Sequence, residues 1–168
     1  MHSTPPPSPP ARPRVHAETV AGDGLQTIRT LCEQRGFVFT AMRQRVLQVL
    51  ADAGVPMKAY AILEEVRRTQ PNAAPTSVYR ALDFLLGQGW AVRLNSINAH
   101  LYVPAGSPAR CTYLVCEECC SVQVVHGAET GANWIDQARI TGFVPASHSV
   151  EISGRCAQCR TADASRGT

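Results

Sequence analysis

The chain has almost no lysine, few aromatic residues and no long apolar run. Lys58 is the single lysine among 16 basic residues, and only 10 of 168 residues are aromatic, so any core is expected to be mainly aliphatic. No apolar stretch approaches the roughly 20 residues of a membrane-spanning helix. No apolar segment near residue 1 resembles a secretion signal. These absences argue against a membrane or secreted protein and predict a cytoplasmic one.

Charge is unevenly distributed along the chain. Residues 1–110 contain 12 basic against 7 acidic residues, whereas residues 111–168 contain 4 against 6. A basic first half is typical of nucleic-acid contact, although a solvated surface gives the same excess. Seven cysteines without a secretion signal indicate a reducing compartment, where metal binding is favoured over disulfides.

Two Cys-x-x-Cys pairs, Cys116–Cys119 and Cys156–Cys159, are the most specific motif, with 36 residues between them. A two-residue gap lets two thiolates turn toward one point, and a second pair completes the tetrahedron that a structural zinc ion requires. Two disulfides, or four inert thiols, are the alternative. The spacing and the expected compartment favour a structural zinc site with four cysteine ligands.

The first part of the chain is expected to be a tail followed by a winged helix-turn-helix domain. Residues 1–22 contain six prolines and no apolar periodicity, which predicts a disordered tail. Residues 23–103 show helical spacing of apolar residues in four segments and then two β-like runs. The helices begin near Leu25, Thr40, Ala59 and Pro75, and the β-like runs are Trp90–Leu94 and Ala99–Val103. Helices followed by a hairpin predict the winged fold.

The rest of the chain predicts a hinge at 104–110, a small zinc-binding dimerisation domain at 111–160 and a disordered tail at 161–168. Three strands and one helix are expected in the second domain, at Thr112–Val115, Val122–Val125, Glu129–Thr141 (the helix) and Val144–Ile152. Such a domain has a small core, so a zinc ion and a partner subunit would each stabilise it. The predicted fold class is α+β with two domains.

The last two helices of the first domain would form the helix-turn-helix, with the second of them in the major groove of DNA. An arginine there can bond guanine or phosphate, and a tyrosine can contact thymine methyls or phosphate. The alternative is that Tyr79 is half-buried and Arg80 pairs with Asp83. The predicted DNA-contacting residues are Ser77, Tyr79 and Arg80, with Tyr60 and Arg43 holding the DNA backbone.

Several ordered motifs resemble the ferric uptake regulator family. They are Thr40-Ala-Met-Arg43 with Val46-Leu47, Ala59-Tyr60, Ser77-Val-Tyr-Arg-Ala-Leu-Asp-Phe-Leu-Leu86 with Gly89, and Glu151-Ile-Ser-Gly154-Arg-Cys156 with the two Cys-x-x-Cys pairs. The resemblance spans about Leu25 to Cys159 and is strongest to the zinc uptake regulator branch. It implies a dimeric, zinc-responsive transcription factor, usually a repressor of zinc-import genes. It also implies that Tyr60 and Arg80 contact bases, and that Glu64 and Arg67 lie where neighbouring dimers pair on DNA.

The chain departs from that branch where sensing is expected. Zinc sensors of the branch commonly have His, Cys and Glu ligands where this chain has Val92, Val103 and Val124, and the family's His-x-His is here Cys111-Thr-Tyr113. Valine cannot bind metal, so the site has moved, sensing has been lost, or another signal is sensed. The candidates for a moved site are Cys111, His100 and His148, followed by Cys120, His126 and Glu129. Each has a plainer alternative as a buried thiol or a surface histidine.

The hypothesis for the mechanism is a two-state regulator. The four-cysteine zinc site would keep the second domain folded and dimeric, and a second, weaker metal near residues 104–111 would set the angle between domains. Only one angle would place both recognition helices in successive major grooves, about 34 Å apart. A regulator that senses another metal, a zinc-stapled interaction module and a redox enzyme using one cysteine pair are the alternatives. The enzyme is disfavoured because no nucleophile and base set is visible.

Overall fold

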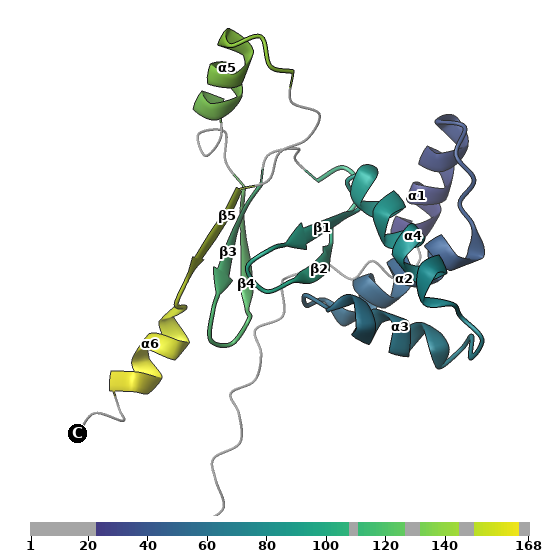
Figure 1. Cartoon of the computed structure of the whole chain (residues 1–168), viewed down its shortest axis with the longest axis horizontal. Helices are drawn as coiled ribbons and strands as arrows, with labels where there is room; N and C mark the ends of the chain where they lie inside the picture. Colours follow the sequence, from purple (N-terminus) through teal and green to yellow (C-terminus); the bar gives the residue numbers. More distant parts are fainter. Residues whose placement is uncertain (1–22, 108–110, 127–131, 145–149, 165–168) are drawn as a thin grey trace, which may run out of the picture.

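The computed structural model describes residues 23–107, 111–126, 132–144 and 150–164, and it confirms the predicted α+β architecture (Figure 1). The helices are α1 (Asp23–Gln34), α2 (Ala41–Ala53), α3 (Ala59–Arg67), α4 (Pro75–Gly87), α5 (Ala132–Ile140) and α6 (Ala157–Ala164). The strands are β1 (Ala91–Leu94), β2 (Ala99–Tyr102), β3 (Cys111–Cys116), β4 (Val122–His126) and β5 (Val150–Gly154). None of the helices in these ranges is long and apolar enough to cross a membrane.

Helices α1–α4 pack around an aliphatic core, as the apolar spacing predicts. The Thr40 hydroxyl accepts a hydrogen bond from the Arg43 N–H at 3.3 Å and so caps α2. Gly54, in the left-handed region with φ 59°, ends that helix. Pro75 occupies the first turn of α4, where its missing N–H costs nothing. Fully buried side chains from all four helices form the core, among them Ile28, Leu47, Leu50, Ile62 and Leu82.

The β1–β2 hairpin is attached firmly to the end of α4. Trp90, between the helix and β1, is buried and packs edge-on against Phe84 with ring centroids 6.0 Å apart. The Trp90 N–H donates to the Leu85 carbonyl at 2.9 Å. Met57, which precedes α3, exchanges two backbone hydrogen bonds with His100 of β2, at 2.7 and 2.8 Å. The hairpin therefore moves with the helices, as the wing of a winged helix-turn-helix unit.

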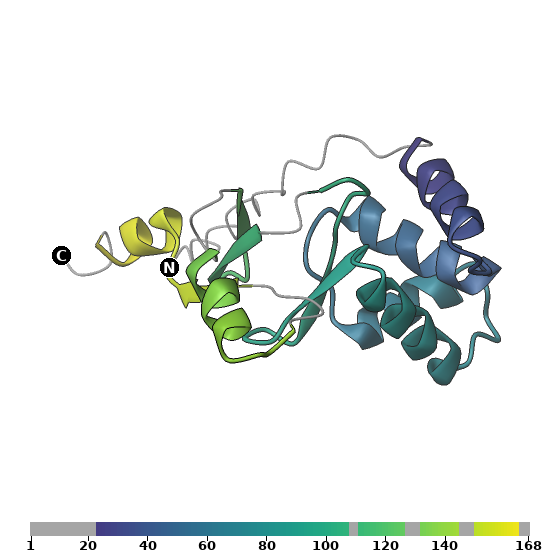
Figure 2. The same cartoon turned by 90° about the horizontal axis from the view of Figure 1, so that it is seen from above.

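The second sheet has the strand order β4-β3-β5. Strand β3 is antiparallel to β4, with Cys111 opposite His126, and parallel to β5, with Thr112 beside Val150. A parallel pair needs a long crossover connection, and α5 lies in it. Figures 1 and 2 show the hairpin between the helices and this sheet, and α6 projecting from the sheet on the side away from α1–α4.

A second apolar cluster joins the hairpin to the sheet. Leu94 and Leu101 of the hairpin contact Tyr113, Val115 and Val122 of β3 and β4, and all five are buried. Cys111 also lies in this cluster, and Val92, Ile97 and Val124 pack at its edge. The described residues thus form two apolar cores, and the hairpin belongs to both.

Two sequence-based boundaries differ from the structure. The predicted strand Val144–Ile152 is wrong at its start, because Val144 is 86% exposed outside any strand and β5 begins at Val150. The predicted tail at 161–168 is wrong for Thr161–Ala164, which continue α6. Helix-favouring alanines follow the second cysteine pair and allow the helix to continue. The predicted tail at 1–22 lies outside the described residues, and the domain boundaries stay predictions.

Truncating the core should destabilise the helical unit. We expect Leu50→Ala to lower the free energy of unfolding by about 2–5 kcal/mol, because it removes buried methyl groups and leaves a cavity. Val38→Ala, at an exposed apolar position, should change it by less than about 0.5 kcal/mol. Denaturant unfolding of both variants checks this, and equal losses would contradict the assignment of Leu50 to the core.

Candidate metal centre and nucleic-acid interface

Parallel pairing of β3 and β5 brings the two Cys-x-x-Cys pairs to one end of the sheet. Cys116 ends β3 and is in register with Gly154, which ends β5 two residues before Cys156. The Glu117 N–H donates to the Gly154 carbonyl at 2.9 Å, and this bond continues the ladder into the first turn. The chain then turns back so that Cys119 faces the start of α6. Two pairs far apart in sequence are thus placed side by side by strand pairing.

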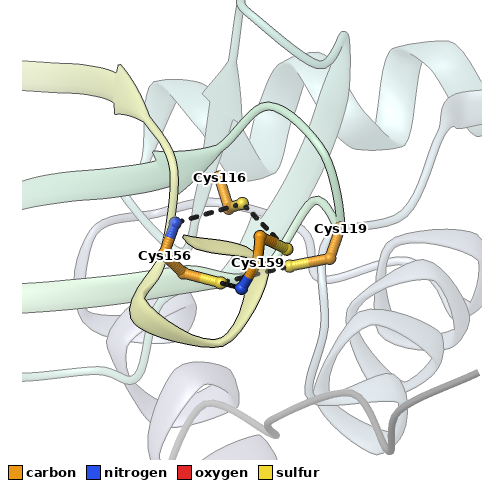
Figure 3. Close-up of side chains that lie close together, drawn as sticks. All are labelled: Cys116, Cys119, Cys156 and Cys159. Carbon is orange, nitrogen blue, oxygen red and sulfur yellow. Dashed lines mark hydrogen bonds between the residues drawn. The ribbon is translucent and has the colours of Figure 1, made fainter. Parts of the chain in front are cut away.

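The four thiols converge with the dimensions of a tetrahedral metal site (Figure 3). The sulfur of Cys116 lies 3.8 Å from that of Cys159, and the sulfur of Cys119 lies 3.7 Å from that of Cys156. All four sulfurs are within 4.8 Å of one another. A tetrahedron with arms of about 2.3 Å, the zinc–sulfur distance, has edges of about 3.8 Å. The thiols therefore fit zinc and stand much too far apart for disulfides.

Backbone amides favour thiolates within the cluster. The N–H groups of Cys156 and Cys159 point at the sulfurs of Cys116 and Cys156, each at 3.4 Å. Burial raises the pKa of Cys116, but hydrogen bonds from the N–H groups of Cys119, Cys156 and Glu118 outweigh it and lower that pKa to about 6. The Cys159 N–H lowers the pKa of Cys156. Donation to the Cys156 sulfur raises the pKa of Cys159.

The surroundings of the cluster brace the two turns against each other. Arg155, beside the second pair, forms an ion pair with Glu118 of the first turn. The thiol of Cys119 lies 3.1 Å from the Ser121 hydroxyl. Cys120 is exposed, adopts the left-handed region at φ 57° and lies outside the four-thiol group. The sequence predicted neither the Arg155–Glu118 ion pair nor the contact of Ser121 with Cys119. The opposite charges of Arg155 and Glu118 were the one feature of the sequence that could have indicated the ion pair.

Most predicted DNA-contacting side chains are exposed on α3 and α4. Tyr60, at the start of α3, is 61% exposed, and Tyr79 on α4 is 52% exposed. Ser77 and Arg80 are exposed on α4 as well. In the described part of the chain, Arg80 forms no ion pair with Asp83, so the alternative of an internal pair has no support. Tyr79 and Arg80 are therefore both exposed on α4.

Arg43, Glu64 and Arg67 have more varied surroundings. The Arg43 guanidinium lies 3.5 Å from the centroid of the Phe84 ring and donates to the Val38 carbonyl, so it braces α2 against α4. Glu64 is exposed on α3. The Arg67 Nε donates to the Ala73 carbonyl at 3.2 Å and so steadies the connection to α4. Arg43 and Arg67 thus have structural contacts that the sequence did not reveal.

The candidates for a moved sensing site are not assembled within the described residues. The four cysteines are the one group of three or more metal-ligating side chains found there. His100 is buried on β2 at 7% exposure, and its Nδ1 has no partner in the described structure. Cys111 is buried at the start of β3, where burial raises its pKa. His148 and Glu129, and the side chain of His126, lie outside the description, so a moved site stays a prediction.

The comparisons with known proteins agree with this geometry. The family model named "Ferric uptake regulator family" matches residues 34–153, which is more than half of the chain. The chain belongs to the ferric uptake regulator family. The zinc uptake regulation protein of Escherichia coli is 31% identical over 156 residues, covering 89% of this chain and 88% of that protein. The protein of the same name from Mycobacterium tuberculosis is 32% identical over 98 residues, covering 58% and 75%.

Solved structures of zinc uptake regulators resemble most of the chain. The crystal structure of holo XcZur has a TM-score of 0.71 at 34% identity, covering 84% of this chain and 99% of that one. A zinc uptake regulator complexed with zinc and DNA has a TM-score of 0.73 at 28% identity, covering 83% and 95%. The resemblance to the family inferred from the sequence motifs is therefore confirmed.

Removing one thiol should empty the metal centre of this family member. We expect Cys159→Ser to reduce bound zinc from about one ion per chain to almost none, because the site would lose one of four ligands. The melting temperature of the part of the protein that contains the second sheet should fall as zinc is lost, since zinc binding contributes to folding in such sites. Elemental analysis and calorimetry check both. Cys120→Ser is the matched control, and its losing zinc instead would contradict the assignment.

Stability should fall in mild acid because of His100. Burial and the neighbouring Arg93 lower the pKa of His100, although the Met57 backbone and Asp83 act in the other direction. The unfolded chain therefore takes up a proton near pH 6.5 while folded His100 does not, so stability is lost as the pH falls below that value. The loss is at most about 1.4 kcal/mol per pH unit.

The measurement is denaturant unfolding between pH 7.5 and 5.5, with zinc content determined at each pH. His100→Gln removes the titrating group, so its pH slope should be shallower than that of the wild type. Equal slopes in the two proteins would show that His100 titrates normally.

Proposed function

We propose that this chain is a homodimeric, zinc-responsive DNA-binding transcription regulator that represses zinc-uptake genes. The observation that carries the proposal is the similarity to a zinc uptake regulator complexed with zinc and DNA, at a TM-score of 0.73 and 28% identity. The names of the curated relatives support the same branch. A regulator of this kind works where the DNA is, in the cytoplasm, and carries out no chemical reaction.

The DNA-binding role rests on α4 and the residues around it. A recognition helix reads base edges from its N-terminal residues, and Ser77, Tyr79 and Arg80 are exposed in the first two turns of α4. Tyr60 and Arg80 are the proposed base-contacting residues. Arg43 would act through its contact with Phe84, which fixes α2 against α4, as well as through DNA phosphate. The excess of basic residues in positions 1–110 favours association with a polyanion.

The proposed dimer would cover apolar side chains of the C-terminal part. The large exposed hydrophobic residues there are Ile140 at the end of α5, Phe143 and Val144 just after it, and Ile152 on β5. Apolar groups in such number commonly mark a protein interface. Glu64 and the terminal nitrogens of Arg67 are proposed to pair between neighbouring dimers on DNA, as opposite charges one turn apart on α3. The proposed domains are 23–103 for DNA binding and 111–160 for zinc binding and dimerisation.

The four-cysteine site is proposed to hold a structural zinc ion. When bound, zinc would hold the ends of β3 and β5 and the start of α6 together. Cys116, Cys119, Cys156 and Cys159 would be its ligands, and the amides of Cys156 and Cys159 would stabilise their negative charge. The proposed sensing step is the binding of a second, regulatory zinc ion by Cys111, His100 or His148.

A second candidate is a family member that has lost this sensing site or senses another signal. Val92 and Val124, at positions where the branch has metal ligands, pack against the apolar cluster between the hairpin and the sheet. Neither side chain can bind a cation. This observation favours a regulator whose DNA binding does not change with a second zinc ion.

DNA binding should depend on Arg80. We expect Arg80→Ala to weaken binding to a duplex selected by the wild-type protein about 10- to 100-fold, the effect of losing a base-contacting arginine. Arg139→Ala is the matched control, because Arg139 is an exposed helical arginine of α5 paired with Asp136, and it should bind normally. Fluorescence anisotropy checks both. Equal DNA affinities of the two variants would show that Arg80 of α4 does not contact DNA.

The same titration, at several buffered zinc concentrations, separates the candidate functions. Tighter binding as a second zinc ion is taken up supports the zinc-responsive regulator. Unchanged affinity at one zinc ion per chain supports the second candidate. A chain that selects no DNA would instead be the zinc-stapled interaction module.

A further inference from the structure

A carboxylate of the second sheet accepts hydrogen bonds from the tip of the wing. Glu151, the second residue of β5, accepts hydrogen bonds from the backbone N–H of Asn95 at 2.8 Å and of Ser96 at 3.0 Å. The Ser96 hydroxyl donates to the same carboxylate. Asn95 and Ser96 begin the turn of the β1–β2 hairpin, 55–56 residues earlier in the chain. One side chain thus ties together two parts of the molecule that are far apart in sequence.

Three donors of the wing tip share the two carboxylate oxygens of Glu151. Both Glu151 oxygens are used: one accepts from Asn95 and the other from the amide and hydroxyl of Ser96. Burial raises the pKa of Glu151, but these hydrogen bonds outweigh it, so the pKa lies below its ordinary value. The carboxylate is therefore charged at neutral pH, and hydrogen bonds to a charged acceptor are about twice as strong as neutral ones.

The wing tip has a shape that presents these donors. Asn98 closes the turn in the left-handed region at φ 48°, and its N–H donates to the Asn95 carbonyl at 3.2 Å. The Arg93 guanidinium donates to the Asn98 side-chain oxygen at 3.0 Å. The turn is thus held by its own contacts, and its first two N–H groups remain for an outside acceptor.

The hydrogen bonds of Glu151 to the wing tip lie beside the apolar cluster that joins the hairpin to the sheet. Glu151 is in register with Tyr113 on the neighbouring parallel strand, so the two side chains leave the same face of the sheet. Tyr113 is buried among Leu94, Leu101 and Val115. Ile152, the next residue of β5, faces the other way and is 51% exposed. The face of β5 that bears Glu151 is the face that meets the wing.

The attachment matters because the wing is continuous with the recognition helix. Trp90 packs on Phe84 of α4, and the Val103 N–H donates to the Trp90 carbonyl at 3.1 Å, which closes the base of the hairpin. The hairpin is held at its base by α4 and at its tip by β5, so it links the orientation of α4 to that of the second sheet. With the tip released, the less directional apolar contacts of Leu94 and Leu101 would be left to fix the angle between α4 and the sheet.

We propose that Glu151 is the latch that sets the orientation of the winged helix unit on the C-terminal sheet. It is a positioning residue, which acts on DNA affinity through the Asn95–Asn98 turn and α4. This inference rests on the proposed DNA-binding function. The latch needs no metal, because its partners are two backbone amides and a hydroxyl.

The first test measures the latch without DNA. In the zinc-loaded full-length protein, Glu151→Gln places an amide nitrogen opposite one of the wing N–H groups, where it cannot accept. Hydrogen exchange of the peptide containing Asn95 and Ser96 should become at least about tenfold faster, while peptides of α2 exchange as in the wild type. Ser96→Ala removes only the hydroxyl contact and should accelerate exchange less. Glu33→Gln, an exposed carboxylate of α1, is the charge-matched control and should change nothing.

The second test asks whether the latch positions α4. Zinc content and melting temperature are measured first, and both should stay at wild-type values in Glu151→Gln. Its affinity for a duplex selected by the wild-type chain should fall about tenfold, within the usual range for coupling between sites, while Glu33→Gln binds normally. Wild-type exchange at the wing tip in Glu151→Gln would overturn the latch. Faster exchange with unchanged DNA affinity would overturn its positioning role.

The two tests separate this inference from the proposed function. If the wild-type chain selects no DNA, the proposed function fails and the positioning role fails with it, while the exchange experiment still reports on the contact between Glu151 and the wing.

Discussion

Parallel pairing of β3 with β5 is the constraint on which the C-terminal half depends. It aligns Cys116 with Gly154, and so places two cysteine pairs that are 36 residues apart at one end of a sheet. The sulfur separations of 3.7 and 3.8 Å then match the edges of a zinc tetrahedron. The same pairing carries Glu151 to a position beside Tyr113, opposite the wing. Metal centre and latch are two results of one strand register.

The hairpin β1–β2 connects this sheet to the helices, and it does so through contacts of two kinds. Apolar contacts of Leu94 and Leu101 resist separation but have little directional preference. The hydrogen bonds to Glu151 are directional and define the angle at which the tip meets β5. Under the proposed function, two recognition helices lie in successive grooves of DNA, and that placement needs such a defined angle. Zinc at the cysteines would hold β3 and β5 in the register that keeps Glu151 in reach.

Arg43, one of the predicted DNA-contacting residues, also has a part in packing the helices. Its guanidinium lies over the Phe84 ring and bonds the Val38 carbonyl, so α2 and α4 are braced by a cation that is also near the surface. Arg67 similarly steadies the connection between α3 and α4 through the Ala73 carbonyl. Two of the basic residues expected from the sequence to serve a partner therefore also hold the helices that carry Tyr60, Tyr79 and Arg80.

By itself, the sequence determined the four helices of the first domain, the hairpin and the four cysteines that come together at the end of the second sheet. Apolar periodicity, caps such as Thr40 and Gly54, and the Cys-x-x-Cys spacing are all local signals. It misplaced the start of β5 and predicted no helix at Ala157–Ala164, where local preference is weak. Only the tertiary structure showed that Glu151 meets Asn95 and Ser96, that Arg43 covers Phe84, and that Val92 and Val124 join an apolar cluster. Those contacts join residues tens of positions apart, and their partners are chosen by strand register and by packing of the hairpin between two cores, which no local pattern encodes.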